Sequence, residues 1–68
     1  MPRSNEVIRQ WNILRDLEAS RRETIDGLAR KTNVTTRTIR RDLIALQTAG
    51  FPIYDEVIDG KRFWKLDT

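Results

Sequence analysis

Residues 35–50 restrict the fold of this 68-residue chain most strongly, because they predict an amphipathic helix with a capping residue at its start and a terminating residue at its end. At about 100° per residue, its large aliphatic residues fall within one narrow arc, which predicts a buried side. The arc consists of Ile39, Leu43 and Leu46, flanked by Asp42, Ala45 and Ala49. Thr35 is a suitable N-cap because its hydroxyl can accept from an otherwise unpaired backbone N–H, and Gly50 can end the helix in the left-handed conformation.

The opposite side of this helix is basic and comprises Arg37, Arg40, Arg41, Ile44, Gln47 and Thr48. A guanidinium presents a rigid fork of donors that can pair bidentately with O6 and N7 of guanine, and a single helix fits the major groove of DNA. Because the N-terminal part of such a helix reaches base edges, the expected DNA contacts are Thr36, Arg37, Thr38, Arg40 and Arg41. A solvated basic surface would show the same pattern, so the neighbouring segments are needed to distinguish a DNA-binding helix from a helix that only faces solvent.

A short helix and a tight turn are expected directly before the basic helix. Thr24 is a suitable N-cap, Asp26 lies in the first turn where the helix dipole favours an acid, and the helix should end near Lys31. Its inward side is expected to consist of Ile25, Leu28 and Ala29. In the turn, Asn33 tolerates the left-handed backbone and Val34 can fill the corner from inside. This is the helix-turn-helix pattern, in which the helix N-terminus at Thr24 could also hold a phosphate.

The first helix is expected to run from a cap at Ser4 or Asn5 to about Ala19 and to serve as a scaffold. Its apolar stripe is predicted to comprise Val7, Trp11, Ile13, Leu14 and Leu17, with Trp11 as a core anchor and not a base-stacking platform. The side facing away is predicted to comprise Arg9, Asn12, Arg15 and Glu18. Ile8 lies off the stripe and is either exposed or in contact with the hairpin or a partner.

Positive charge is concentrated on residues 20–41. This segment holds seven basic and two acidic residues, and because the whole chain has a formal net charge of +3, the remainder carries −2. Arg21 and Arg22, in the polar connection after the first helix, are candidates for phosphate contacts, although a solvated loop would look the same. This distribution is expected of a nucleic-acid binder.

Two β-prone segments flank Asp59-Gly60, the dipeptide most typical of a two-residue hairpin turn. The expected pairs are Ile53 with Leu66, Asp55 with Trp64, Val57 with Arg62, and Ile58 with Lys61. The face expected to close the core comprises Ile53, Val57, Trp64 and Leu66, and the other face carries Tyr54, Ile58 and Phe63. At the tip of this wing, Lys61 and Arg62 are placed to contact the DNA backbone or minor groove, although they would equally protect an edge strand.

The residues present argue against several functions. The chain has no cysteine and no histidine, which removes disulfides, the usual zinc ligands, the commonest general base and the Cys/His and Ser/His dyads. We therefore expect no enzymatic activity, no metal and no cofactor. No apolar run is long enough to span a membrane, and the N-terminus lacks the hydrophobic segment of a signal peptide, so we expect a cytoplasmic protein.

Two motifs carry a family resemblance, Arg37-Thr38-Ile39-Arg40-Arg41-Asp42-Leu43 and Ala45-Leu46-Gln47-Thr48-Ala49-Gly50-Phe51-Pro52-Ile53. With Arg9-Gln10-Trp11 and Ser20-Arg21-Arg22, they resemble the N-terminal winged helix of bacterial WYL-domain transcriptional regulators, from about Arg9 to Leu66. The part from Thr38 to Leu43 is shared with DeoR-type sugar-metabolism repressors, whereas the ending Trp64-Lys65-Leu66 favours the WYL group.

The resemblance implies DNA contacts from Thr36, Arg37, Thr38, Arg40 and Arg41, a phosphate contact from Thr24, and wing contacts from Lys61 and Arg62. Such regulators are usually several times longer, with a C-terminal WYL domain that binds a ligand or nucleic acid and controls dimeric DNA binding. Residues 1–68 are therefore expected to be a single DNA-binding domain of a longer, homodimeric regulator. Gly27 departs from the pattern, because a better helix former is expected there.

The segments together predict an α+β winged helix-turn-helix, with three helices followed by a two-stranded antiparallel hairpin. We expect it to bind double-stranded DNA sequence-specifically, with residues 35–49 in the major groove and a wing at residues 59–62. Asp42 is expected to be structural, with a partner such as Arg9, Arg15 or a backbone N–H. The alternative is a winged helix that docks a protein through Tyr54, Ile58 and Phe63.

Overall fold

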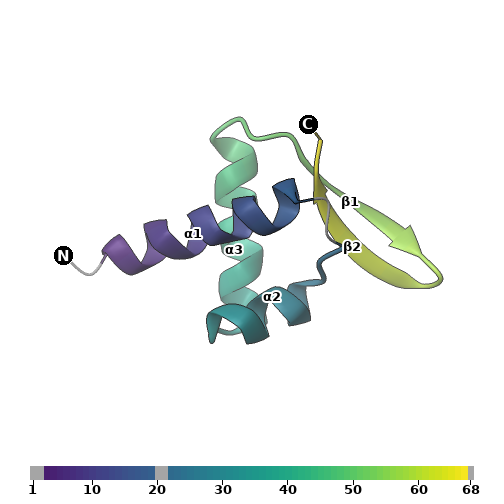
Figure 1. The fold of residues 1–68 in the computed structure, drawn as a ribbon, viewed down its shortest axis with the longest axis horizontal. Helices are drawn as coiled ribbons and strands as arrows, with labels where there is room; N and C mark the ends of the chain where they lie inside the picture. The colour runs from purple at the N-terminus through teal and green to yellow at the C-terminus, as the bar shows by residue number, and fades with distance from the viewer. Residues whose placement is uncertain (1–2, 20–21, 68) are drawn as a thin grey trace.

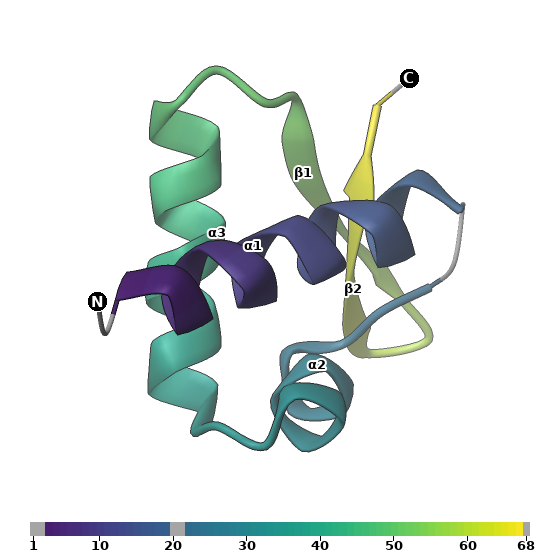
Figure 2. The same ribbon diagram turned by 60° about the vertical axis from the view of Figure 1, so that its left-hand side comes forward.

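Three helices precede a two-stranded antiparallel sheet in the computed structural model, which describes residues 3–19 and 22–67 (Figure 1). The elements are α1 (Arg3–Glu18), α2 (Ile25–Thr32), α3 (Thr36–Thr48), β1 (Ile53–Ile58) and β2 (Lys61–Leu66). α1 crosses α3, α2 lies at the N-terminal end of α3, and the hairpin lies toward the C-terminal end of α1 (Figures 1 and 2). This is the predicted α+β winged helix-turn-helix fold.

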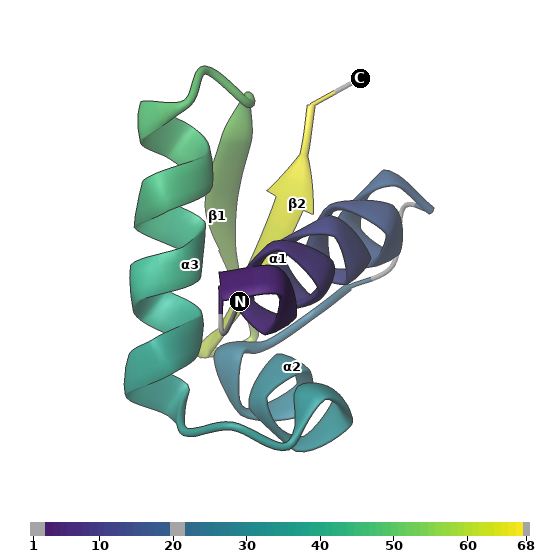
Figure 3. The same cartoon turned by 90° about the vertical axis from the view of Figure 1, so that its left-hand side faces the viewer.

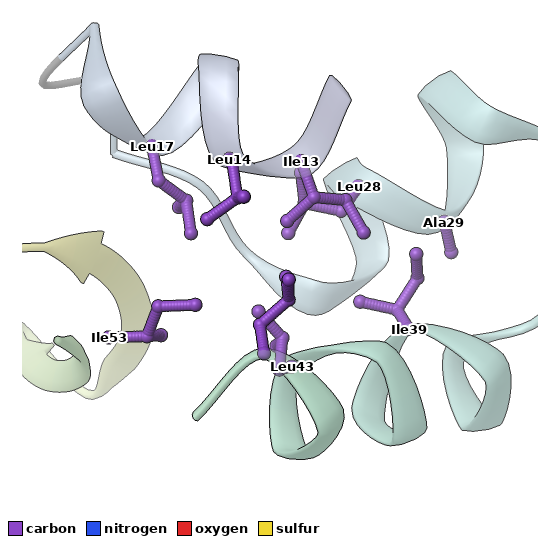
Figure 4. Close-up of a cluster of buried hydrophobic side chains, with 9 residues drawn as sticks. Ile13, Leu14, Leu17, Leu28, Ala29, Ile39, Leu43 and Ile53 are labelled. Atoms are coloured by element: carbon purple, nitrogen blue, oxygen red, sulfur yellow. The ribbon is translucent and has the colours of Figure 1, made fainter. Parts of the chain in front are cut away.

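A cluster of aliphatic side chains fills the space between the helices and β1 (Figure 4). Its members are Ile13, Leu14, Leu17, Leu28, Ala29, Ile39, Leu43, Leu46 and Ile53, and the residues packed against it are Ile25, Val34, Trp64 and Leu66. The aliphatic arc of α3 is therefore buried, as predicted. Ala45 and Ala49, expected beside that arc, are exposed, because α1 meets α3 on the side of Asp42.

The predicted caps and turn residues of α2, α3 and the turn between them are confirmed. The Thr24 hydroxyl accepts from the N–H of Gly27 at 3.0 Å, and the Thr35 hydroxyl accepts from the N–H of Thr38 at 3.2 Å. Asn33 adopts the left-handed conformation with φ 59°, and Gly50 follows the end of α3 with φ 104°. Asn33 and Thr35 lie in the turn between α2 and α3, so their local conformations help to place the N-terminal end of α3.

The hairpin has the predicted register, from Ile53 opposite Leu66 to Ile58 opposite Lys61. Both turn residues have positive φ, 52° at Asp59 and 78° at Gly60, which is the type I′ geometry that fits the twist of a hairpin. Val57, expected in the core, is exposed, because it lies near the turn and the hairpin extends beyond the helices there (Figure 1).

The prediction for α1 is wrong at several positions. Val7 and Trp11 are each 62 % exposed, so Trp11 is not a core anchor, and Ile8 is exposed as well. Arg9, expected to face away, turns toward α3 and pairs with Asp42. On a helix, residues 9 and 13 share one side while 7 and 11 lie on another, so pairing with Asp42 turns Val7 and Trp11 outward. α1 also begins at Arg3, so neither Ser4 nor Asn5 is its cap.

Candidate nucleic-acid interface

The basic side of α3 lies on the outside of the molecule. In Figure 3 the other elements all lie on one side of α3, and its opposite side faces solvent. The exposed residues of that side are Arg37, Arg40, Arg41, Ile44, Gln47 and Thr48, as predicted. Within residues 3–19 and 22–67, no carboxylate forms an ion pair with these three arginines. Their guanidiniums are therefore available to an anionic partner.

A hollow of about 540 Å³ lies between the N-terminal ends of α2 and α3 and the hairpin. Among its lining residues are five of the predicted contacts: Thr24, Thr36, Arg40, Lys61 and Arg62. Arg30, which was not among the predicted contacts, adds a further cation, and among the described residues Asp26 is the one acid that lines the hollow. Residues from three separate segments thus form one cationic groove that continues the basic side of α3.

The two wing cations differ in their partners. Arg62 pairs with the carboxylate of Asp55, which lies on the same face of the hairpin. Lys61 is exposed and, among the described residues, forms no ion pair. Lys61 is therefore the wing residue whose full charge remains available, whereas the charge of Arg62 is partly compensated.

The other predicted contacts that the structure describes do not line the groove. Arg22 is exposed just before α2, and Arg37 and Arg41 lie on the outward side of α3. Thr38 is half-buried, and its hydroxyl lies 3.1 Å from that of Thr35, so it belongs to the cap of α3. Arg21 lies outside the described residues.

A buried ionic network fixes the rotation of α3 about its own axis. Asp42 is only 2 % exposed and accepts from Nε and Nη2 of Arg9 at 2.5 and 3.0 Å, and from Nε2 of Gln10 at 3.0 Å. The hydrogen bond to Asp42 raises the pKa of Arg9 above its ordinary value, although partial burial acts in the opposite direction. Asp42 is thus structural and paired with Arg9, one of the predicted partners. Because α1 holds the inner side of α3, the arginine-bearing side faces outward.

Three hydrogen bonds that were not predicted anchor the hairpin, either directly or through the segment before α2. The N–H of Trp64 donates to the carbonyl of Glu23 at 2.7 Å, so the segment before α2 forms a β-bridge with β2. The buried Glu23 carboxylate accepts from Nζ of Lys31 at 2.7 Å. Nε2 of Gln47 donates to the carbonyl of Ile53 at 2.9 Å, which ties the end of α3 to β1. The wing is therefore fixed relative to both helices of the motif.

The fold and this surface define a winged helix-turn-helix domain. A family model described as "HTH domain" matches residues 9–57, and the chain belongs to this helix-turn-helix family. Membership indicates DNA as the partner, and such domains are typically not enzymes. No curated protein and no solved structure matches the chain. In the described part of the chain, no helix is long and apolar enough to cross a membrane, and no cluster of three residues suited to bind a metal occurs.

Proposed function

We propose that the chain is the sequence-specific, double-stranded DNA-binding domain of a bacterial transcriptional regulator, with α3 in the major groove and the hairpin as a wing. The observation that carries the proposal is the set of three unpaired guanidiniums on the outward side of α3, continuous with the cationic groove. A helix with this surface presents donors in the geometry that guanine accepts, and the groove lies where a flanking phosphate backbone would pass.

The contacts divide into two kinds. Arg37, Arg40 and Arg41 project from the first turns of α3 and are assigned to base edges. The phosphate contacts are assigned to Arg21, Arg22, Thr24, Thr38, Lys61 and Arg62, and Thr36 remains a DNA contact of the first turn of α3. Phosphate contacts position the protein on the duplex, while the base contacts supply specificity.

The resemblance to WYL-domain regulators supports a further part of the proposal. In such a regulator this domain would sit at the N-terminus and act as a homodimer, each copy reading one half-site about 34 Å from the other. A location in the cytoplasm follows from that role.

A selection from random duplex DNA tests the proposed function. We expect the chain to enrich a defined motif and to bind it with an affinity that falls steeply as salt rises, because phosphate contacts release counterions. No enrichment together with no salt-dependent duplex binding would contradict the proposal and favour the alternative, a protein-docking winged helix that uses Tyr54, Ile58 and Phe63.

Replacing Lys61 with alanine should weaken binding to all duplexes alike and reduce the slope of log K against log salt by about one, since one phosphate contact is lost. Salt titrations on a selected and an unrelated duplex measure both effects. Lys65→Ala is the matched control, because Lys65 lies on the same face of the same strand but away from the turn, outside the groove, and pairs with Glu56. Equal effects of the two substitutions would remove Lys61 from the interface.

A further inference from the structure

The outward side of α3 carries one large aliphatic residue among its arginines. Ile44 is 60 % exposed, although an isoleucine in water forgoes the free energy of burial. On the helix it lies one turn beyond Arg40 and Arg41 and two turns beyond Arg37. What sets Ile44 apart from the other exposed apolar residues is this position, because it continues the row of arginines along the outward side of α3.

The spacing of these four residues matches a known mode of base reading. Arg37, Arg40, Arg41 and Ile44 stand at positions i, i+3, i+4 and i+7 of α3. The major-groove contacts of a homeodomain recognition helix have the same spacing. Seven residues of helix cover about 10 Å, so Ile44 can reach base pairs that the arginines of the first turn do not.

The side chains of Ile44 and its neighbour Gln47 indicate which groups of DNA this part of α3 can contact. Gln47, on the same side of α3, uses its amide nitrogen to donate to the carbonyl of Ile53 at 2.9 Å. The amide nitrogen of Gln47 is thus engaged in fixing β1, and the side chain of Ile44 itself offers no donor or acceptor. The apolar group that B-DNA displays in its major groove is the C5-methyl of thymine.

We propose that Ile44 contacts the C5-methyl group of a thymine and makes α3 specific for that base beside the pairs read by its arginines. The inference rests on the proposed function, because it requires α3 to lie in the major groove. It adds an apolar determinant to a surface whose other base-reading residues are cationic.

Deoxyuridine substitution isolates the proposed contact. Deoxyuridine pairs as thymine does but lacks the methyl group, so each thymine of the selected motif is replaced singly and the Kd is measured. For the unaltered chain we expect about a fourfold loss of affinity at one thymine per half-site, the effect of exposing one methyl group. Ile44→Ala should bind the thymine duplex less tightly and lose its sensitivity at that position, while Ile44→Val should retain part of it.

A second isoleucine provides the matched control. Ile8 is 58 % exposed but lies on α1 and not on the outward side of α3, so Ile8→Ala should leave both the affinity and the methyl sensitivity unchanged. Because Ile44 and Ile8 are both exposed, both variants should keep the thermal unfolding midpoint of the unaltered chain.

The outcomes separate this inference from the function beneath it. Sequence-specific binding with no methyl-sensitive thymine, or a sensitivity that persists in Ile44→Ala, would overturn the role of Ile44 and leave the proposed function intact. An unaltered chain that shows no sequence-dependent duplex binding would overturn both.

Discussion

Replacing Arg9 with alanine should lower the free energy of unfolding by about 3 kcal/mol, because it leaves the carboxylate of Asp42 buried without its charge partner. This loss of stability is at the lower end of the range for breaking a buried ion pair, because the Arg9 side chain is 17 % exposed and therefore partly solvated. A domain of this size has a total stability of only about 3–5 kcal/mol. The thermal midpoint should therefore fall by about 12–24 °C, measured by circular dichroism.

Two further variants show whether the loss comes from the unpaired charge. Arg15→Ala removes an exposed arginine of the same helix and should change stability by less than about 0.5 kcal/mol. Combining Arg9→Met with Asp42→Leu removes both charges and should restore most of the lost stability, because an apolar pair of similar volume replaces a buried ion pair at little cost. If Arg9→Ala were as stable as Arg15→Ala, the network would not hold α3 in place.

The contribution of this pair should also be insensitive to pH on the basic side. The pKa of Arg9 is raised in the folded chain, so the stabilisation from its charge is complete below the ordinary arginine pKa. It would be lost only as the pH rises through the raised value. Unfolding measured across the neutral and mildly basic range should show the same difference between Arg9→Ala and the unaltered chain.

The elements whose signals are local could be predicted from the sequence. Thr24, Thr35 and Asn33 cap or turn the backbone through atoms within a few residues of themselves, and Asp59-Gly60 imposes its own turn geometry. The outward side of α3 could be predicted for the same reason, because the helical periodicity places its aliphatic residues and its arginines on opposite sides. The fold and the basic side of α3 can therefore be predicted from short segments of the sequence.

The contacts that assemble the site could not be predicted in this way. Arg9 and Asp42 are 33 residues apart, so the sequence names Arg9 only as one of several candidate partners of Asp42, while the apolar stripe of α1 places Arg9 on the side facing away. The predicted apolar stripe of α1 is too wide, because it includes Val7 and Trp11, which are exposed. The sequence pattern alone does not say how α1 is rotated against α3. Likewise, the bridge from Glu23 to Trp64 depends on the packed position of the hairpin. Arg30 joins the groove only because that packing brings α2 and the wing together.

Arg40 is the residue whose loss should affect DNA binding most, because it belongs both to the outward side of α3 and to the cationic groove. Arg40→Ala is expected to cost about 1–3 kcal/mol of binding free energy and to relax specificity at one base pair of the selected motif. Titrations against duplexes altered at each position in turn measure both effects.

Charge alone would predict a different pattern, and two variants separate the possibilities. Arg40→Lys keeps the charge but loses the bidentate fork, so it should retain the salt dependence and lose the preference at that base pair. Arg15→Ala removes one positive charge, as Arg40→Ala does, but from an exposed part of α1, so it should leave specificity intact. If Arg40→Lys kept full specificity, Arg40 would act as a phosphate contact, and the reading of bases would pass to Arg37 and Arg41. A side chain that reads a base should lose its base preference when the guanidinium fork is replaced by an ammonium group, even though the positive charge remains.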